Sequence, residues 1–214
     1  QQEFARARAC GFEHIEWLVT AERIELNPLW TPGGLEAIAR QARATGISVK
    51  SVCADCLISH PLVRVSETDR AAGMQTLAHL IEQASRLHVE VVLVPLLEAG
   101  AIANDAEGVA VIEAMAGAFE RAARVGIRIG LESDLPATRL AALIDQAGPV
   151  SAGAYYDLGN AAARGADAVK EILTLGSRLF GVHVKDRPRA GASVPLGAGA
   201  ADFRACFQAL AAVD

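Results

Sequence analysis

The sequence predicts an α/β fold built on a parallel sheet, and three observations lead to this prediction. Six segments with the composition of buried strands alternate with helix-length segments in units of about 30 residues, as expected for parallel strands joined by crossover helices. No G-x-G-x-x-G motif follows the first strand, so the main signature of a dinucleotide-binding sheet is absent from the sequence. Several strands end on polar residues, namely Glu16, Asp55, Glu132, Asp157 and His183. Because barrel enzymes take functional groups from many strand ends, this pattern favours a (β/α)8 barrel over an open sheet.

The expected strands are short and rich in β-branched or apolar residues. The run VEVVLVPLL lacks alternation, as a strand covered on both faces does. The strands are expected at His14–Val19, Ile47–Ala54, Val89–Leu97, Ile127–Glu132, Ser151–Asp157 and Leu179–Lys185. Six strands cannot close a standard eight-stranded barrel, so we expect one partial barrel domain over residues 1–214.

The expected helices show apolar residues at helical spacing and begin or end at recognisable caps. Ser66 is a good N-cap residue, and Gly11 and Gly46 follow helices in the position where glycine is common. Residues 55–66 are expected to form a loop. The helices are expected at Glu3–Ala9, Leu35–Thr45, Glu67–Leu87, Ala106–Arg124, Pro136–Ala147, Ala162–Leu175 and Asp202–Ala212.

Composition excludes several classes of partner. A net charge of −5 and a pI near 5.6 argue against binding to nucleic acid backbones, which requires a basic face. No apolar stretch is long enough for a membrane span.

Cys53 and Cys56 form a C-x-x-C motif typical of a redox pair or half a zinc site, but they lie where a strand enters a loop, which favours two packed residues. Cys10 and Cys206 are isolated, and a reducing cytoplasm is the expected location.

Three metal-competent residues end successive strands. Glu132 and Asp157 are 25 residues apart, and Asp157 and His183 are 26 apart, so each step is one strand–helix unit. The three side chains are therefore expected side by side at one end of the sheet. Carboxylate and imidazole ligands suit Mn²⁺, Mg²⁺ or Co²⁺, and Zn²⁺ is also compatible. Three ligands leave open positions for a substrate, as metal-assisted catalysis requires.

Each of these residues also has a structural interpretation. Asp157 precedes Leu-Gly-Asn and is compatible with a helix N-cap. His183 lies in an apolar strand and is compatible with a partnered core histidine, and Glu132 is compatible with a charge at a helix N-terminus. The coincidence of all three at successive strand ends favours the metal site.

The segments GLESD, YYDLGNA, HVKDR and VPLGAGAADF resemble the sugar phosphate isomerase/epimerase family, which has a xylose isomerase-like barrel. Ketose 3-epimerases and L-ribulose- or L-xylulose-5-phosphate 3-epimerases are the most similar members. The resemblance extends over most of the chain, with GFEHIEW similar to the second strand of that family and SVCADCLISHPL similar to the third. The motifs are specific to the superfamily but say little about the substrate.

The resemblance implies one divalent cation held by Glu132, Asp157, His183 and a second glutamate from the last strand. It places that glutamate beyond Asp214 and the first strand before Gln1, so that this chain lacks strands one and eight of the barrel. It further implies a homodimer or homotetramer and a small sugar or sugar phosphate as the substrate.

The implied activity is isomerisation or epimerisation of a keto-sugar or its phosphate, with Glu132 as catalytic base. Such reactions remove a proton from the carbon next to a carbonyl, and the cation stabilises the charge of the cis-enediolate that forms. Return of the proton to the other face gives an epimer, and return to the neighbouring carbon gives an isomer. The sequence does not distinguish the two.

Eight further residues are candidate contacts to the substrate. Arg187 or Arg189 is suited to a hydroxyl or a terminal phosphate, and the amides of Gly197 and Gly199 are placed where barrels commonly bind phosphate, although plain turns are equally compatible. The full set is Glu16, His60, Asn160, Lys185, Arg187, Arg189, Gly197 and Gly199.

Other functions are compatible with the same barrel. Inosose dehydratase or hydroxypyruvate isomerase activity would use the same kind of metal site. Endonuclease IV-like phosphodiesterases need about three zinc ions and many more histidines at strand ends than this acidic chain offers, so this alternative is disfavoured. A chain without the fourth ligand is also compatible with an inactive, truncated paralogue.

Overall fold

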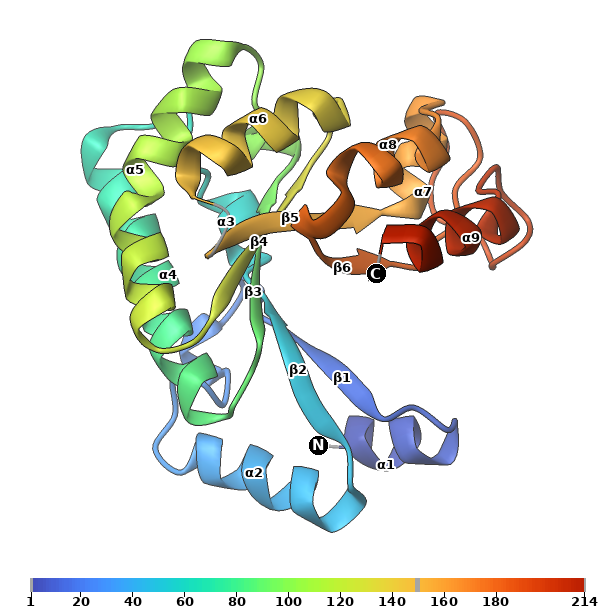
Figure 1. The fold of residues 1–214 in the computed structure, drawn as a ribbon. Coiled ribbons are helices and arrows are strands. Elements are labelled where there is room, and N and C mark those ends of the chain that lie inside the picture. The colour runs from blue at the N-terminus through green and yellow to red at the C-terminus, as the bar shows by residue number, and fades with distance from the viewer. Residues whose placement is uncertain (1, 149–150, 214) are drawn as a thin grey trace.

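The computed structural model describes residues 2–148 and 151–213, and these residues contain a six-stranded sheet (Figure 1). The strands lie side by side in the order of the chain, and every neighbouring pair is parallel. The prediction of alternating strands and helices is confirmed. The strands are β1 (His14–Leu18), β2 (Ser48–Cys53), β3 (Val91–Leu96), β4 (Arg128–Ser133), β5 (Ala152–Asp157) and β6 (Leu179–His183).

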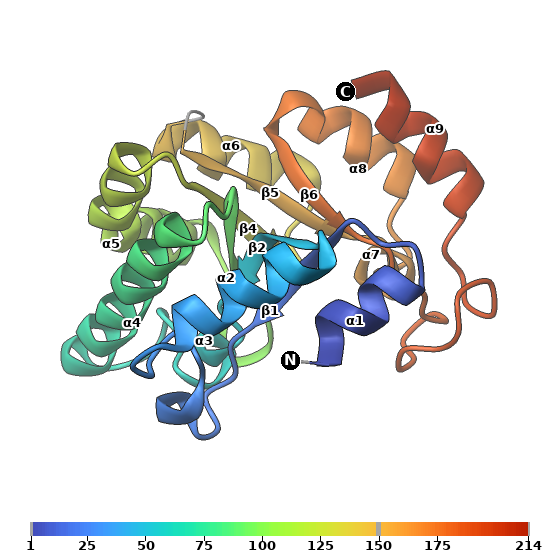
Figure 2. The ribbon, with the colours of Figure 1, turned by 90° about the horizontal axis from the view of Figure 1, so that it is seen from below.

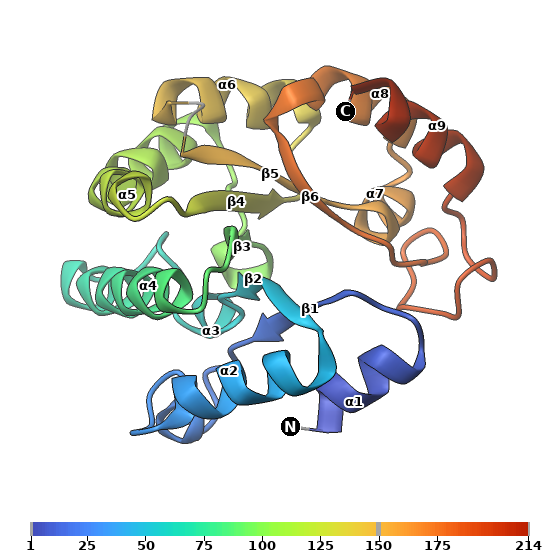
Figure 3. The same cartoon turned by 60° about the horizontal axis from the view of Figure 1, so that its bottom comes forward.

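The helices lie outside the curved sheet and follow the order of the strands (Figure 2, Figure 3). Contacts between helices run from α4 to α5, from α5 to α6, from α6 to α8 and from α8 to α9. The helices are α1 (Gln2–Ala9), α2 (Gly34–Thr45), α3 (Cys56–Ser59), α4 (Glu67–Arg86), α5 (Asp105–Arg124), α6 (Ala137–Ala147), α7 (Leu158–Arg164), α8 (Ala168–Leu175) and α9 (Phe203–Val213), with short 3-10 turns at Ile24–Leu26, Glu98–Gly100 and Gly176–Arg178. No helix within the described residues is long and apolar enough to cross a bilayer.

The sheet is an open part of a barrel. Within residues 2–148 and 151–213, β1 pairs only with β2, and β6 pairs only with β5. The partial (β/α) barrel predicted from the six-strand pattern is therefore confirmed. The expected strand before Gln1 and the expected glutamate after Asp214 concern chain outside the described residues.

The main core lies between the sheet and the outer helices. All six residues of β3 are buried, as its uniformly apolar sequence predicts. Leu77, Leu80 and Ile81 of α4 are fully buried in the same core, as is Met115 of α5. Burial of each such side chain stabilises the fold by roughly 1.5–3 kcal/mol, so this layer holds the strands rigidly in place.

Two expectations about local structure are wrong. The helix expected over Ala162–Leu175 is two helices, because α7 begins directly after β5 and ends at Gly165, whose φ of 71° stops a right-handed helix. Asp167 then caps α8 with a hydrogen bond from the amide of Lys170. The loop expected at residues 55–66 contains the single-turn helix α3.

Glycines on β4 and β6 leave room for a tyrosine ring on the inner face of the sheet. A Cβ atom at Gly181 would lie 2.3 Å from the ring of Tyr155, and one at Gly130 would lie 3.0 Å from it. The Tyr155 ring therefore occupies space that only glycine leaves on β4 and β6. Since side chains two residues apart share a face of a strand, Glu132, Asp157 and His183 lie on this inner face, one step further along.

Candidate metal centre

Glu132, Asp157 and His183 come together at the carboxyl ends of β4, β5 and β6. One ligand atom from each lies within 4.8 Å of the other two. Asp157 and His183 are direct partners in the β5–β6 register. The side chains of Glu132 and Asp157 are buried, and that of His183 is about one third exposed (31%). The structure thus brings together the three residues that the strand spacing singled out.

Asn160 holds one oxygen of each carboxylate. Its backbone amide donates to Asp157 Oδ1 at 2.7 Å, which is the N-cap bond of α7, and its side-chain Nδ2 donates to Glu132 Oε1 at 3.2 Å. The remaining oxygens, Glu132 Oε2 and Asp157 Oδ2, each lie 3.9 Å from His183 Nδ1. Asp157 therefore caps a helix with one oxygen and faces the cluster with the other. The structure is thus compatible with Asp157 both as a helix N-cap and as a metal ligand.

His183 is oriented by Glu16 from the other side of the partial barrel. The His183 Nε2–H donates to Glu16 Oε1 at 3.0 Å, and Glu16 Oε2 accepts from the Ser51 hydroxyl at 2.6 Å. The ring of Tyr155 packs against the imidazole, with the ring centroids 4.8 Å apart. With Nε2 committed to Glu16, Nδ1 is the nitrogen that faces the two carboxylates. A carboxylate that fixes the tautomer of a histidine ligand is the usual second partner of a metal-binding imidazole.

In the absence of a metal, the electrostatics of this cluster favour a protonated His183 beside an ionised Glu16. Burial by itself would lower the pKa of His183, but the carboxylates of Glu132 and Glu16 outweigh burial and raise it to about 10. Burial likewise would raise the pKa of Glu16, but the hydrogen bonds from His183 and Ser51 outweigh it and lower that pKa. Burial and the nearby Glu16 raise the pKa of Tyr155 to about 12, so its hydroxyl stays protonated.

The donor set fits one divalent cation. At 3.9 Å, neither carboxylate oxygen is within hydrogen-bonding distance of His183 Nδ1. Two ligand atoms that each lie about 2.1 Å from a shared ion are separated by roughly 3–4 Å, which matches the two distances from Nδ1, and the third pair of ligand atoms lies within 4.8 Å. Two oxygens and one nitrogen suit Mn²⁺, Mg²⁺ or Co²⁺, and Zn²⁺ accepts the same ligands. Among the described residues, no other group of three or more such side chains has this proximity.

The cluster forms part of the wall of a cavity of about 530 Å³. A cavity of this size suits a small molecule such as a monosaccharide. Its wall is formed by strand ends and the loops that follow them. The lining residues are Glu16, Leu18, Cys53, Asp55, Ile58, Pro95, Leu97, Glu98, Glu132, Asp134, Asp157, Asn160, His183, Val184, Lys185 and Arg187.

Two cations line the cavity beside Asn160. Arg187 Nη1 donates to Asn160 Oδ1 at 2.8 Å, and Lys185 Nζ lies 3.3 Å from the same oxygen and 3.4 Å from Asp157 Oδ2. The Asn160 side chain thus accepts from cations through its oxygen and donates to Glu132 through its nitrogen. Four of the predicted substrate contacts, Glu16, Asn160, Lys185 and Arg187, line the cavity.

The other four predicted contacts lie elsewhere in the structure. His60 lines a separate cavity of about 220 Å³, with its Nδ1 3.2 Å from the carbonyl of Cys56. Arg189 is exposed and lies over Gly165, at the end of α7. The amides of Gly197 and Gly199 both donate to Asp186 Oδ2, at 2.9 and 2.8 Å. A substrate role for these four residues stays a prediction.

Several residues of the site carry no strong signal in the sequence. Ser51 and Tyr155 contribute through Glu16 and His183, and Glu98 lines the cavity from the loop after β3. Asp186 is 1% exposed and accepts three amide bonds. Ser51 lies two residues before Cys53 and therefore shares a face of β2 with it. The period-two pattern of the strand was thus a usable signal that the Ser51 hydroxyl faces the inside. Loop geometry decides the positions of Glu98 and Asp186, and no sequence pattern indicated either.

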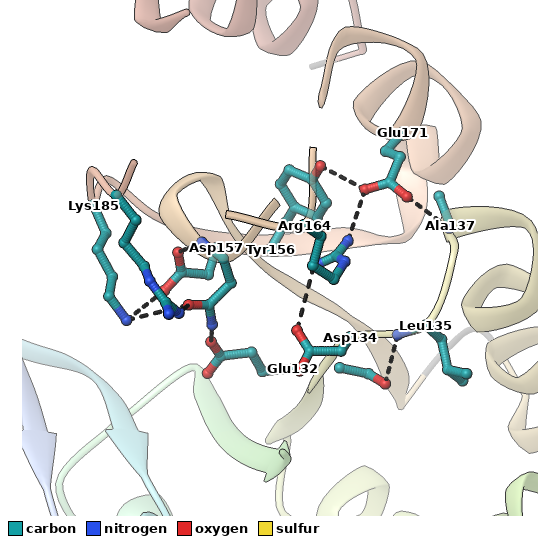
Figure 4. A network of polar contacts seen from close by, with 12 residues as sticks. Glu132, Asp134, Leu135, Ala137, Tyr156, Asp157, Arg164, Glu171 and Lys185 are labelled. Atoms are coloured by element: carbon teal, nitrogen blue, oxygen red, sulfur yellow. Dashed lines mark hydrogen bonds and ion pairs between the residues drawn. The ribbon is translucent and has the colours of Figure 1, made fainter. Parts of the chain in front are cut away.

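A second polar network lies behind the ligand-bearing strands (Figure 4). Glu171 of α8 accepts from the Tyr156 hydroxyl at 2.7 Å and from Arg164 at 3.1 Å, and the amide of Ala137 donates to its other oxygen at 3.3 Å. Arg164 also reaches Asp134, at 3.3 Å. This network ties the loop after Glu132 to the helices that follow Asp157.

The C-x-x-C motif does not contribute to this centre. Cys53 and Cys56 are buried and free, and neither belongs to the metal-competent group found among the described residues. Burial and nearby carboxylates raise the pKa of both thiols, to about 11 for Cys56. Both residues are therefore weak nucleophiles, as expected for packed cysteines.

Comparisons with known proteins agree with the architecture. L-ribulose-5-phosphate 3-epimerase UlaE of Salmonella paratyphi A is 25% identical over 218 residues, covering 95% of this chain and 75% of that protein. The crystal structure of an IOLI protein with a binding zinc atom superposes with a TM-score of 0.82 at 16% identity, covering 100% of this chain and 80% of that one. The structure of D-psicose 3-epimerase in the presence of D-fructose gives a TM-score of 0.78 at 16% identity, covering 99% and 74%.

The sequence model of one protein family matches almost the whole chain. The match runs over residues 4–214, and the family is described as the xylose isomerase-like TIM barrel. Its fold agrees with the six parallel strands and outer helices of this structure. The chain therefore belongs to the xylose isomerase-like TIM barrel family.

Proposed function

We propose that this protein is a divalent-metal-dependent isomerase or epimerase of a keto-sugar or sugar phosphate. The observation that carries the proposal is the convergence of Glu132 Oε2, Asp157 Oδ2 and His183 Nδ1 at one wall of a cavity of about 530 Å³. The similarity to an L-ribulose-5-phosphate 3-epimerase and to the fold of D-psicose 3-epimerase supports the same class of reaction.

Glu132, Asp157 and His183 would hold the cation. A divalent cation at this position supplies a Lewis acid that polarises a ketone and offsets the negative charge that develops on its oxygen. The protein prepares the ligands beforehand, because Asn160 and Glu16 already fix the orientation of all three side chains. Such preorganised polar groups cost no reorganisation during the reaction.

Glu132 is the proposed catalytic base. Its Oε2 faces the cluster and would hold the cation, so Oε1, which accepts one hydrogen bond from Asn160 Nδ2, is the oxygen left to take a proton from a carbon next to the ketone. The opposite face of the substrate requires a second base for epimerisation, and the glutamate expected after Asp214 is the candidate. Lys185 and Arg187 line the cavity within reach of substrate oxygens.

The test is exchange of solvent deuterium into a ketose. We expect the metal-loaded protein to incorporate deuterium next to the carbonyl, and Glu132→Gln to reduce that rate by about 10²–10⁴-fold, the usual contribution of a general base. Glu120→Gln on the exposed face of α5 is the matched control and should not change the rate. NMR of the product separates an epimer from an isomer. Undiminished exchange in Glu132→Gln would contradict the assignment of Glu132 as the base.

The proposal includes a cytoplasmic location and a small-molecule partner. The four cysteines are free, as expected in a reducing compartment. A homodimer or homotetramer is proposed from the resemblance to the family, and light scattering of the purified chain would measure it.

A further inference from the structure

The walls of the cavity allow the substrate class to be narrowed, on the assumption that the proposed function is correct. We propose that the substrate is an uncharged polyhydroxy ketone and that the cavity discriminates against its phosphate ester. Three observations carry this inference: the balance of charges that line the cavity, the partners of its two cations, and the partners of the loop amides at its edge.

Carboxylates dominate the charge of the cavity wall. Among the described residues six carboxylates line it, against the two cations Lys185 and Arg187, and one of the six, Asp134, is paired with Arg164 behind the wall. With that pair set aside, one divalent cation in the metal centre would still leave an excess of one negative charge. The acidic residues are Glu16, Asp55, Glu98, Glu132, Asp134 and Asp157. A phosphate dianion placed in this wall would meet like charges, and like-charge juxtaposition inside a cavity of low dielectric is unfavourable.

Both cations already have partners in the protein. Lys185 Nζ lies 3.4 Å from Asp157 Oδ2 and 3.3 Å from Asn160 Oδ1. Arg187 donates through Nη1 to Asn160 Oδ1 at 2.8 Å and through Nε to the carbonyl of Gly191 at 2.8 Å. A phosphate would therefore have to share Lys185 with Asp157 and Asn160, and could reach Arg187 only through N–H groups other than the two already used.

The loop after β6 offers no open anion site either. In TIM barrels the loops after the seventh and eighth strands frequently bind phosphate through backbone amides. Here the amides of Gly197, Gly199 and Ala201 all donate to Asp186, at 2.9, 2.8 and 3.1 Å. A Cβ atom at Gly199 would lie 2.2 Å from the Asp186 carboxylate, so this glycine accommodates Asp186. An internal carboxylate therefore already accepts from the amides that this loop would offer to an anion.

The part of the cavity wall that follows β2 and β3 is suited to hydroxyl groups. Asp55, after β2, and Glu98, after β3, line the cavity and make no side-chain hydrogen bond or ion pair within residues 2–148 and 151–213. Carboxylate oxygens accept hydrogen bonds and repel anions. Burial first, and then the charge of Glu98, raise the pKa of Asp55, which agrees with two acidic groups sharing this wall. These two residues are the proposed determinants of specificity.

The inference is tested with matched pairs of substrates. The metal-loaded protein is assayed for deuterium incorporation with L-ribulose and L-ribulose 5-phosphate, and with D-fructose and D-fructose 6-phosphate. We expect kcat/KM for the free ketose to exceed that for its phosphate by about tenfold or more in at least one pair. A preference for the phosphate in either pair would overturn the inference while leaving the proposed isomerase function intact.

Direct binding measurements keep the inference testable when no ketose reacts. Inorganic phosphate and a free ketose are titrated separately into the protein and followed by amide NMR shifts of residues that line the cavity. Shifts with the ketose and none with phosphate support the inference, and saturable phosphate shifts at Lys185 and Arg187 overturn it. Absence of exchange with every ketose counts against the proposed function alone, because this titration measures the charge preference independently.

A double variant locates the discrimination. Asp55→Asn combined with Glu98→Gln removes two negative charges from the wall after β2 and β3, and we expect the ratio of kcat/KM values, free ketose to phosphate, to fall by about tenfold, or ~1.4 kcal/mol. The control, Glu113→Gln with Glu120→Gln on α5, removes the same charge far from the cavity and should leave the ratio unchanged. An equal change in both double variants would show that net charge, and not this wall, sets the ratio, and would overturn the assignment.

Discussion

The two walls of the cavity are built differently. On the β4–β6 wall, Glu132, Asp157 and His183 each have a hydrogen-bond partner that fixes their orientation, and Asn160 joins two of them. On the β2–β3 wall, Asp55 and Glu98 have no such partner among the described residues. One wall is fixed before a substrate arrives, and the other presents open acceptors.

The difference separates two tasks. A reactive group must be held within a fraction of an ångström of its working geometry, which requires supporting hydrogen bonds. A group that recognises hydroxyls gains more from an unoccupied acceptor, because it exchanges water for substrate at little cost. We therefore expect changes on the β4–β6 wall to alter metal binding and turnover, and changes on the β2–β3 wall to alter substrate preference.

The largest expected effect follows from Asp157→Asn. Asparagine is as good an N-cap residue as aspartate, so α7 should remain, while the negatively charged oxygen that faces His183 is lost. Metal affinity should fall by more than about 100-fold, beyond the 10–100-fold typical of supporting residues. Metal analysis should find one divalent ion per wild-type chain and none in the variant, with an unchanged circular dichroism spectrum. One ion per chain in the variant, or three zinc ions in the wild type, would contradict the proposed centre.

Glu16→Gln should have a smaller effect on the same quantity. Glu16 touches the centre through His183, and removal of its charge loosens the tautomer and the orientation of the imidazole. A 10–100-fold loss in metal affinity is expected, measured by competition with a chelator. Ser51→Ala, which removes only the hydroxyl that supports Glu16, should cost less. Glu16→Gln with wild-type metal affinity would assign Glu16 to the substrate instead.

The contrast between the walls also explains how much was readable from the sequence. The order of strands and helices follows from apolar periodicity, and the convergence of Glu132, Asp157 and His183 follows from their regular spacing, because parallel strands end at one edge. Both are consequences of repeating backbone geometry. The break between α7 and α8 at Gly165 escaped prediction because Asp157 starts a helix at once, where a loop was expected.

Loops carry the features that the sequence did not reveal. Gly197 and Gly199 resemble an open phosphate loop in sequence, but their amides turn inward to Asp186, a residue that sequence reasoning did not single out. Glu98 lies in the loop after β3 and itself has a φ of 52°, in the left-handed region. Such positions are set by the three-dimensional path of a loop, for which no periodic signal exists.

The network behind the β4–β6 wall should contribute to stability more than to specificity. Glu171→Ala leaves the Tyr156 hydroxyl and Arg164 without their shared acceptor, and we expect a loss of about 1–3 kcal/mol in the free energy of unfolding. Tyr156→Phe removes only the donor and should cost about 1 kcal/mol. Urea denaturation measures both. If Glu171→Ala changed the preference between free and phosphorylated ketoses without changing stability, the division of tasks between the walls would be wrong.

The smallest expected effect concerns the acid side of the pH range. Burial would raise the pKa of Asp186, but the amides of Gly199, Ala201 and Gly197 outweigh burial and lower that pKa below its ordinary value. A carboxyl whose pKa is lower in the folded state contributes stability above its unfolded pKa of about 3.9, and this contribution is lost as the pH falls through the folded value. Amide hydrogen exchange of residues 197–201 should therefore accelerate below about pH 4 in the wild type.

In Asp186→Asn the exchange of these amides should be faster at neutral pH and should lack that acid-dependent step, since asparagine does not titrate. An acid-dependent step that persisted in Asp186→Asn would mean that another group anchors the loop, and that the amides of Gly197 and Gly199 are open to an anion after all.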